Sequence, residues 1–375
     1  MDKIVRFFES WPIKLFYALL FSVPIFFYSI NNPFYNWDTV GYVASVISFE
    51  ENDYEKIQRE TYGDIKSYFP PEKYEQIKSG SDYRETVYSD PRALSQQVPF
   101  YKIRYFYLKF LSVVSGFTES ISEATVYTSA IFCFLISLAT AWYFARLGFL
   151  YYLFPFILLP IRFISLSRVS TPDAMASFFA FIAVMLYQDK KTLSLFILSF
   201  LPLIRTDFII LAFVMFLVRI YKGGKWWEYL FFAASFAVYM WVNKYAGNYG
   251  HLTIFNFTLI PNDLRPYPEQ MPISTDVKDY FEAYLSGAYS FFSRGDSLIF
   301  IASVLLVLVD LLKREIKFST LGLIIGSAFL AVHFSLFPAA FQRTYFAANL
   351  VMLYFLIFKF CCSKEMPLIF RLKKN

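Results

Sequence analysis

The chain has 375 residues, of which 57% are hydrophobic and 22% aromatic, and its mean hydropathy is +0.45. Soluble domains are less apolar than this, and a net charge of +6 is too small to indicate a nucleic-acid partner. The 47 Phe and 29 Tyr are typical of a polytopic membrane protein whose aromatic side chains gather at the bilayer interfaces.

Cysteines and histidines form no metal-binding pattern. Cys133 lies inside an apolar run, and Cys361 and Cys362 are adjacent at the end of another, where an ordinary helix end and an acylation site are the alternatives. His251 and His333 are isolated, without the spacing of metal ligands. No metal or other cofactor is indicated, and a divalent metal is left open.

The first apolar run, residues 13–30, is predicted to span the membrane. Lys3, Arg6 and Lys14 precede or begin it, and basic residues favour the cytoplasmic side. The run lacks the small-residue cleavage site of a signal peptide, so we expect it to be retained as a helix.

A polar segment, residues 31–98, comes next and mixes acidic residues with Lys and Tyr. This composition predicts a folded outer loop with short helices rather than disorder. Near its start, residues 36–42 read NWDTVGY and place Asp38 at the membrane surface. Asp38 either caps a helix that begins near Val40 or takes part in chemistry, and the local sequence leaves both open.

Residues 100–117 are apolar enough to span but contain Lys102, Arg104 and Lys109. Each such charge near the bilayer centre costs about 2.5–3.5 kcal/mol on an insertion scale. We therefore expect an amphipathic helix at the interface, with a spanning helix as the alternative.

The hydropathy pattern as a whole predicts an all-α polytopic membrane protein with about ten spans and both termini cytoplasmic. Every strongly basic short loop then falls on one side of the membrane, and both long loops fall on the other. The predicted spans are residues 13–30, 124–146, 150–165, 172–187, 193–204, 208–220, 227–242, 297–312, 320–337 and 345–358.

Three regions follow from this division. Residues 1–243 form a transmembrane core that includes the outer loop at 31–123. Residues 244–296 form a second outer loop, and residues 297–375 hold the last transmembrane helices and a basic cytoplasmic tail.

Charged residues within the apolar segments gather on the predicted outer face. Ionisable groups inside a membrane are costly and are usually functional or paired with one another. Carboxylates near several arginines suit an anionic substrate and the abstraction of a proton. The residues are Asp38, Arg162, Arg168, Asp173, Arg205, Asp207, His333 and Arg343.

Each of these residues also has a purely structural explanation. Asp173 follows Pro172 and could start a helix, where an acid is favoured by the helix dipole. Arg205 could pair with Asp207, and Arg343 could extend to the outer headgroups. A carboxylate at an apolar rim is expected to have a raised pKa, which would suit it to accept a proton.

The order of these elements resembles the GT-C glycosyltransferases, and the nearest pattern is that of the protein O-mannosyltransferases and lipid A aminoarabinose transferases. The resemblance covers about residues 10–220, and more loosely residues 342–345. Trp37 and Thr39 flank Asp38 where many relatives carry a second acid. The motifs that carry the resemblance are the early Asp38, PFY at 99–101, ARLG at 145–148 and RVSTPDA at 168–174.

The family implies an inverting transfer of a sugar from a polyprenyl-phosphate donor within the bilayer to an external acceptor, which is a glycan, a glycolipid or a protein. Asp38 matches the general base, and Asp173 matches an acid that shapes the site. The remaining assignments are Arg205, Arg343 and Arg168 for the donor phosphate, and Trp37 and Tyr42 for the sugar or acceptor.

Such an enzyme would lie in a bacterial inner membrane with its active site on the outer, periplasmic or lumenal face. Two other functions are compatible with the sequence. One is a polysaccharide polymerase of the O-antigen type, which uses lipid-diphosphate oligosaccharides. The other is a transporter or flippase for a lipid-linked glycan.

Overall fold

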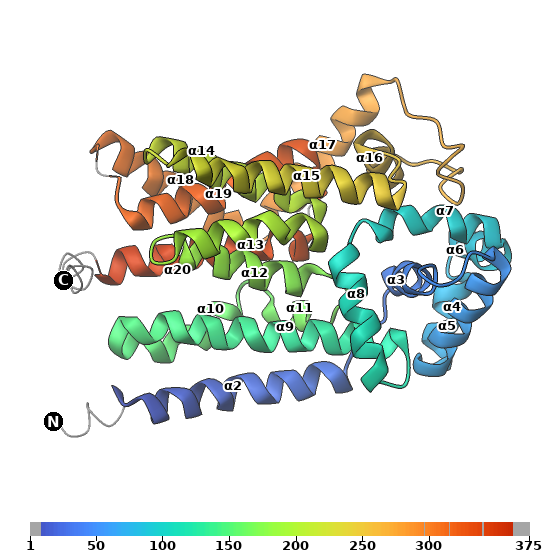
Figure 1. Ribbon diagram of the computed structural model, residues 1–375, viewed down its shortest axis with the longest axis horizontal. Coiled ribbons are helices and arrows are strands. Elements are labelled where there is room, and N and C mark those ends of the chain that lie inside the picture. The colour runs from blue at the N-terminus through green and yellow to red at the C-terminus, as the bar shows by residue number, and fades with distance from the viewer. Residues whose placement is uncertain (1–8, 296, 315, 340, 363–375) are drawn as a thin grey trace.

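The computed structural model describes residues 9–362 except 296, 315 and 340, and these residues fold into α-helices and short 3₁₀ turns (Figure 1). Long helices run along one axis as a bundle, and shorter helices cover one end of it, which we call the cap end. Within the described ranges no β-strand forms, and Phe34 and Val169 make a single bridge. The predicted all-α fold is confirmed.

The bundle places the start of α2 and the end of α20 together at the end opposite the cap (Figure 1). The basic residues predicted to flank these helices, Lys3 and Arg6 and most of the C-terminal tail, lie outside the described residues. The bundle helices are α2 (Trp11–Asn31), α9 (Ile121–Phe144), α10 (Phe154–Leu158), α11 (Phe163–Arg168), α12 (Asp173–Leu186), α13 (Lys191–Ile204), α14 (Ile209–Tyr221), α15 (Tyr229–Ala246), α18 (Ser297–Leu312), α19 (Phe318–Leu336) and α20 (Gln342–Cys362).

The outer surface of α2 is apolar, and its inner surface is polar. Phe16 and Leu20 are 65% and 59% exposed, whereas Ser22 and Ser29 are buried. The Ser22 hydroxyl lies 2.5 Å from that of Ser137 on α9. Small polar residues between helices and large apolar residues outside are the pattern of helix packing in lipid, and α2 fits this pattern.

Four segments of the described chain are long and apolar enough to cross a membrane, and a fifth is possible if α17 (Val277–Phe292) and α18 form one broken span. Several predicted spans are shorter as helices: α12 and α13 have 14 residues each and α14 has 13. A membrane span needs about 17–25 residues. Length and composition alone identify four or five spans in the described chain, and the predicted ten are not confirmed.

The predicted third span, residues 150–165, is not one helix. It breaks into the end of a 3₁₀ segment and the short helices α10 and α11, which return alongside α9. Gly148 and Arg162 both adopt positive φ, at 62° and 59°, and so turn the chain before and after α10. Pro155 stands in the first turn of α10, where a proline is tolerated.

Residues 100–117 do not form one helix, because one helix ends within them and a short second helix follows. The preceding helix α7 ends at Lys102, and α8 (Tyr105–Val114) has 10 residues, too few to span a bilayer. This length favours the interfacial interpretation. The charges stay near aromatic rings: the Lys109 ammonium lies 3.9 Å from the centre of the Phe49 ring.

The cap consists of the first outer loop, which folds around its own hydrophobic core. Asp64 joins it to the bundle, because its carboxylate accepts hydrogen bonds from the backbone N–H groups of Ile121 and Ser122 at the start of α9, at 2.7 and 2.9 Å. This contact satisfies donors that a helix start leaves open. The cap helices are α3 (Asp38–Ile47), α4 (Tyr54–Tyr68), α5 (Pro71–Ser79), α6 (Asp82–Ser89) and α7 (Pro91–Lys102).

The second outer loop packs against the cap. It contains α16 (His251–Leu259) and leads into α17. Gln97 of α7 donates its side-chain N–H to the carbonyl of Pro266 at 3.0 Å, and Tyr267 donates its hydroxyl to Asp90 at 2.7 Å. Both long loops therefore lie at the same end of the bundle, as the sequence predicted.

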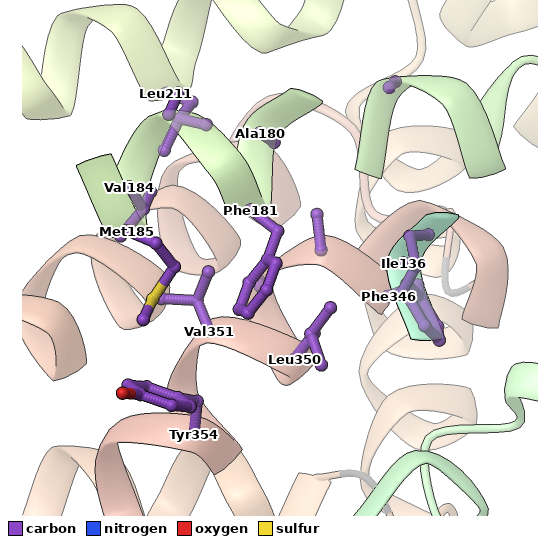
Figure 2. Close-up of a cluster of buried hydrophobic side chains, with 14 of the residues drawn as sticks. Ile136, Ala180, Phe181, Val184, Met185, Leu211, Phe346, Leu350, Val351 and Tyr354 are labelled. Carbon is purple, nitrogen blue, oxygen red and sulfur yellow. The ribbon is translucent and has the colours of Figure 1, made fainter. Parts of the chain in front are cut away.

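Helices α12 and α20 run parallel through the centre of the bundle. Figure 2 shows Phe181, Val184 and Met185 of α12 facing side chains of α20 that include Leu350 and Val351. Because the two helices are parallel, their first residues lie at the same end. Asp173, which begins α12, and Arg343, near the start of α20, thus meet at the cap end.

Candidate active site

A cavity of about 450 Å³ lies between the bundle and the cap. Its walls come from both outer loops and from the cap-end turns of the bundle, so the site is built from segments far apart in the sequence. The charged residues of the described chain that line it are Asp38, Arg104, Asp173, Arg205, Asp207 and Arg343, together with His251 and His333.

The centre of this lining is an ion-pair network that starts from Asp38. One nitrogen of the Arg343 guanidinium lies 2.7 Å from the Asp38 carboxylate, and another lies 3.8 Å from the carboxylate of Asp173. Asp173 is also paired with Arg205. Its side chain is only 4% exposed, and a buried carboxylate needs such partners to stay ionised.

The network continues from Arg205 to a histidine. Arg205 makes two hydrogen bonds with the Asp207 carboxylate, at 3.0 and 2.6 Å. The His333 Nε2 atom lies 2.9 Å from the same carboxylate. Acidic and basic groups therefore alternate from Asp38 to Asp207, and His333 is the last member of the network.

Local backbone structure explains why these side chains converge. Asp38 and Asp173 are the first residues of α3 and α12, where the helix dipole favours an anion. Arg205 is extended, at φ −148° and ψ 121°, and ends α13. The charges thus stand at helix ends, and the structural explanation offered for Asp173 holds together with its place in the cavity.

Asp38 does not act as a conventional helix cap. The residue before α3 is Trp37, which has no capping side-chain bond, and the Asp38 carboxylate contacts side chains instead. Tyr101 donates its hydroxyl to Asp38 at 3.3 Å. This approach depends on Gly41, because a Cβ atom there would lie 2.2 Å from the Tyr101 ring.

The pKa of Asp38 differs from the sequence-based expectation. Burial raises the pKa of this carboxyl, but the charges of Arg343 and Arg104 and the hydrogen bonds from Arg343 and Tyr101 together outweigh burial, so the pKa lies below its usual range. The expectation of a raised pKa was wrong, because it counted the apolar rim and not the arginines. Asp38 is therefore ionised and paired with Arg343.

Five of the residues predicted for the site line the cavity: Asp38, Tyr42, Asp173, Arg205 and Arg343. The structure thus brings together groups that the sequence could only assign to one face.

Two predicted site residues do not line the cavity. Trp37 packs into the cap, with its ring 5.0 Å from that of Tyr83. Arg168 donates to the backbone carbonyl of Asn32 and lies 5.4 Å from the Tyr28 ring, so it fastens α11 to the end of α2.

The cavity also contains residues that the sequence did not assign to it. Arg104 faces Tyr42 and Tyr101 at 5.7 and 5.6 Å from the ring centres. It had been counted as a charge of an interfacial helix. His333 was described as isolated because it lacks the spacing of metal ligands, and its partner Asp207 is 126 positions away. The predicted cluster of outer-face charges contained His333 without a role, and it did not contain Arg104.

Nothing in the described part of the chain brings together three His, Cys, Asp or Glu side chains in a way that could hold a metal ion. Comparisons with protein-family models, with curated proteins and with solved structures find no match to this chain. The assignment of a function therefore rests on the residues and on the geometry of the cavity.

Proposed function

We propose that this protein is a membrane glycosyltransferase that transfers a sugar from a polyprenyl-phosphate donor to a hydroxyl acceptor, with inversion at the anomeric carbon. The observation that carries the proposal is that Asp38, Arg343 and Asp173 line one cavity at an end of an apolar helix bundle. A carboxylate beside a guanidinium offers both groups the reaction needs: a proton acceptor and a partner for the leaving phosphate.

The reaction is a single displacement. The Asp38 carboxylate takes the proton of the acceptor hydroxyl as the hydroxyl oxygen attacks the anomeric carbon. The bond between that carbon and the phosphate oxygen breaks, and its electron pair stays on the phosphate. The polyprenyl phosphate leaves with one additional negative charge, which a positioned guanidinium stabilises.

Arg343 is better suited than Arg205 to the phosphate. Arg205 is held between two carboxylates, Asp173 and Asp207, whereas Arg343 makes its close contact with Asp38 alone and lies 3.8 Å from Asp173. A donor phosphate that shares Arg343 draws positive charge away from Asp38. The pKa of Asp38 then rises, and the carboxylate becomes a stronger base once the donor is bound.

The same proposal includes the finer architecture: a GT-C-like arrangement, about ten membrane crossings with several short or broken helices, and a cap that faces the outer side of a bacterial inner membrane. Grouping of both long loops at one end of the bundle supports this orientation. The acceptor is then a periplasmic or lumenal glycan, glycolipid or protein.

The experiment that tests the function compares donor classes. The full chain in nanodiscs is incubated with membranes of a deletion strain, which supply acceptors, and with polyprenyl-monophosphate or polyprenyl-diphosphate sugars. Products are analysed by mass spectrometry. The proposal predicts a glycosylated product and free polyprenyl monophosphate. Products from diphosphate donors alone would indicate a polymerase. Movement of the lipid-linked substrate across vesicles that contain the protein, without a covalent product, would indicate a transporter.

A further inference from the structure

A second cavity, of about 420 Å³, lies beside the first. Arg343 and Phe341 line both cavities, so a single arginine forms part of the wall between them. The second cavity is formed by the segment before α3, by the turn around α11, by the end of α17 and by the start of α20. Its other lining residues are Phe34, Asn36, Ile161, Arg162, Ser165, Leu166, Val169, Arg294 and Phe346.

The described charged side chains that line this second cavity are arginines. They are Arg162, Arg294 and Arg343, and no acidic side chain is among the described residues that line it. The first cavity, by contrast, has three aspartates. Guanidinium groups at a cavity wall attract an anion, and a guanidinium binds phosphate oxygens through charge-assisted hydrogen bonds.

Arg162 is held in an unfavourable backbone conformation at this cavity. Its φ of 59° and ψ of 40° lie in the left-handed region, which a residue with a long side chain rarely adopts. Such strain costs about 1–3 kcal/mol and is concentrated at functional sites. Here it places a cationic side chain at the cavity, where the turn could otherwise have used Gly or Asn.

Asn36 adds a side-chain amide whose hydrogen-bonding groups are unsatisfied. Both the nitrogen and the oxygen of its side-chain amide are shielded from solvent and have no hydrogen-bond partner among the described atoms. A shielded amide without a partner costs free energy, which a bound ligand would recover. The amide nitrogen can donate to a phosphate oxygen.

The surroundings favour a lipid-linked anion. Apolar side chains, among them Phe34 and Phe346, complete the wall of the cavity. The adjacent helix α17 carries Phe281, Leu285 and Tyr289 at intervals of four, with exposed fractions of 61%, 54% and 80%. An exposed apolar stripe on an amphipathic helix is typical of a helix that lies in the membrane interface.

If α17 lies in the interface, Arg294, two residues after its end, lies near the lipid phosphates. It donates to the Ser290 hydroxyl at 2.9 Å. The same arginine lines the second cavity.

We propose that the second cavity binds the phosphate of the polyprenyl-linked donor through Arg162, Arg294 and Asn36, and presents it to Arg343. This inference rests on the proposed function and deepens it. The donor occupies the second cavity, the acceptor occupies the first, and Arg343 between them contacts both the leaving phosphate and the base Asp38.

Binding is tested with farnesyl phosphate, a short polyprenyl phosphate, by native mass spectrometry of the purified full chain in detergent micelles. Arg162→Asn and Arg294→Gln are each expected to weaken binding about tenfold or more, since each removes a charge-assisted contact. Asn tolerates the left-handed backbone of residue 162, so the first variant removes the charge and keeps the turn. Arg162→Lys keeps the charge and is expected to lose less.

Three comparisons define the ligand. Farnesol lacks the phosphate and is expected to bind at least tenfold more weakly than farnesyl phosphate, and inorganic phosphate lacks the chain and is also expected to bind more weakly. Arg59→Gln, an exposed arginine of α4, removes the same charge away from the cavity and is expected to leave binding unchanged. Inorganic phosphate binding as tightly as farnesyl phosphate would overturn the assignment to a lipid.

Failure of this inference can be told apart from failure of the proposed function. If neither Arg162→Asn nor Arg294→Gln weakens farnesyl phosphate binding or raises the KM for the donor, the second cavity is not the phosphate site, even when the wild type transfers sugar. If binding depends on both arginines but no donor yields a transferred sugar, the phosphate site stands and the transferase does not.

Discussion

Both ends of the bundle contain buried ion pairs of similar chemistry, but the pairs differ in the space beside them. At the end opposite the cap, Arg219 pairs with Glu228, and Lys359 pairs with Asp310. At the cap end, Asp38, Arg343 and Asp173 form the start of a longer network. The space beside the Arg219 pair is about 10 Å³, whereas the cap-end network borders about 450 Å³.

This difference teaches that buried charge in a membrane protein does not by itself define a site. Glu228 and Arg219 pair with each other, and the space beside them is too small to admit a substrate. Asp38 and Arg343 pair with each other in the wall of a cavity, so a substrate in the cavity can replace either residue as the partner of the other. Mutations at the cap end should therefore mainly lower activity, and mutations at the opposite end should mainly lower stability.

The largest expected effect is that of Arg343→Gln on activity. The variant loses the guanidinium that stabilises the leaving phosphate, and kcat is expected to fall by about 10²–10³-fold. Because Arg343 is 31% exposed and Asp173 keeps its pair with Arg205, the thermal midpoint should fall less than in a variant that breaks the Arg219–Glu228 pair. Donor turnover and thermal unfolding of the same preparation measure both quantities, with Arg59→Gln as the matched control.

Glu228→Gln should have the opposite result. It leaves the buried Arg219 without its carboxylate, and breaking a buried pair costs about 3–5 kcal/mol. We expect a lower thermal midpoint and an unchanged kcat per folded molecule. Glu60→Gln, on the exposed side of the cap, serves as control. A stable but inactive Glu228→Gln protein would contradict the division between the two ends.

Gly41→Ala is expected to reduce activity about tenfold, since small displacements of reacting groups have effects of this order or larger. The added methyl group would overlap the Tyr101 ring and push its hydroxyl away from Asp38. Gly63→Ala is the control, because a Cβ atom at that position of α4 meets nothing within 4 Å. Equal rates in the two variants would show that the Tyr101 contact is not needed.

The pH dependence tests the pairing of Asp38 itself. The base acts in its ionised form, which is lost as pH falls through the pKa of the folded protein. Since Arg343 helps to hold this pKa below its usual 3.8, kcat/KM of the wild type should fall only at pH values below that. In the residual activity of Arg343→Gln the acid limb should move to higher pH. Coincident acid limbs would exclude Asp38 as the titrating base.

Much of this arrangement could be predicted from the sequence, because charges are costly in lipid and must meet partners. Asp38, Asp173, Arg205 and Arg343 each follow or precede an apolar run, and this placement assigned them to one face. The helical fold followed from the same runs.

Other features depend on tertiary contacts that no local pattern records. Trp37 precedes Asp38 directly, but successive residues at a helix start point in different directions, so its ring enters the core of the cap. His333 contacts Asp207 although the two residues are far apart in the sequence. The left-handed turn at Arg162 breaks a run that reads as a continuous span.

The measurement that tests the central claim most directly is the rate of sugar transfer by Asp38→Asn in nanodiscs, with Asp82→Asn on the surface of the cap as control. Asparagine keeps the shape of the side chain but cannot accept the proton, so the rate should fall by about 10²–10⁴-fold while farnesyl phosphate still binds. Transfer by Asp38→Asn at the wild-type rate would show that the cavity does not use Asp38 as its base.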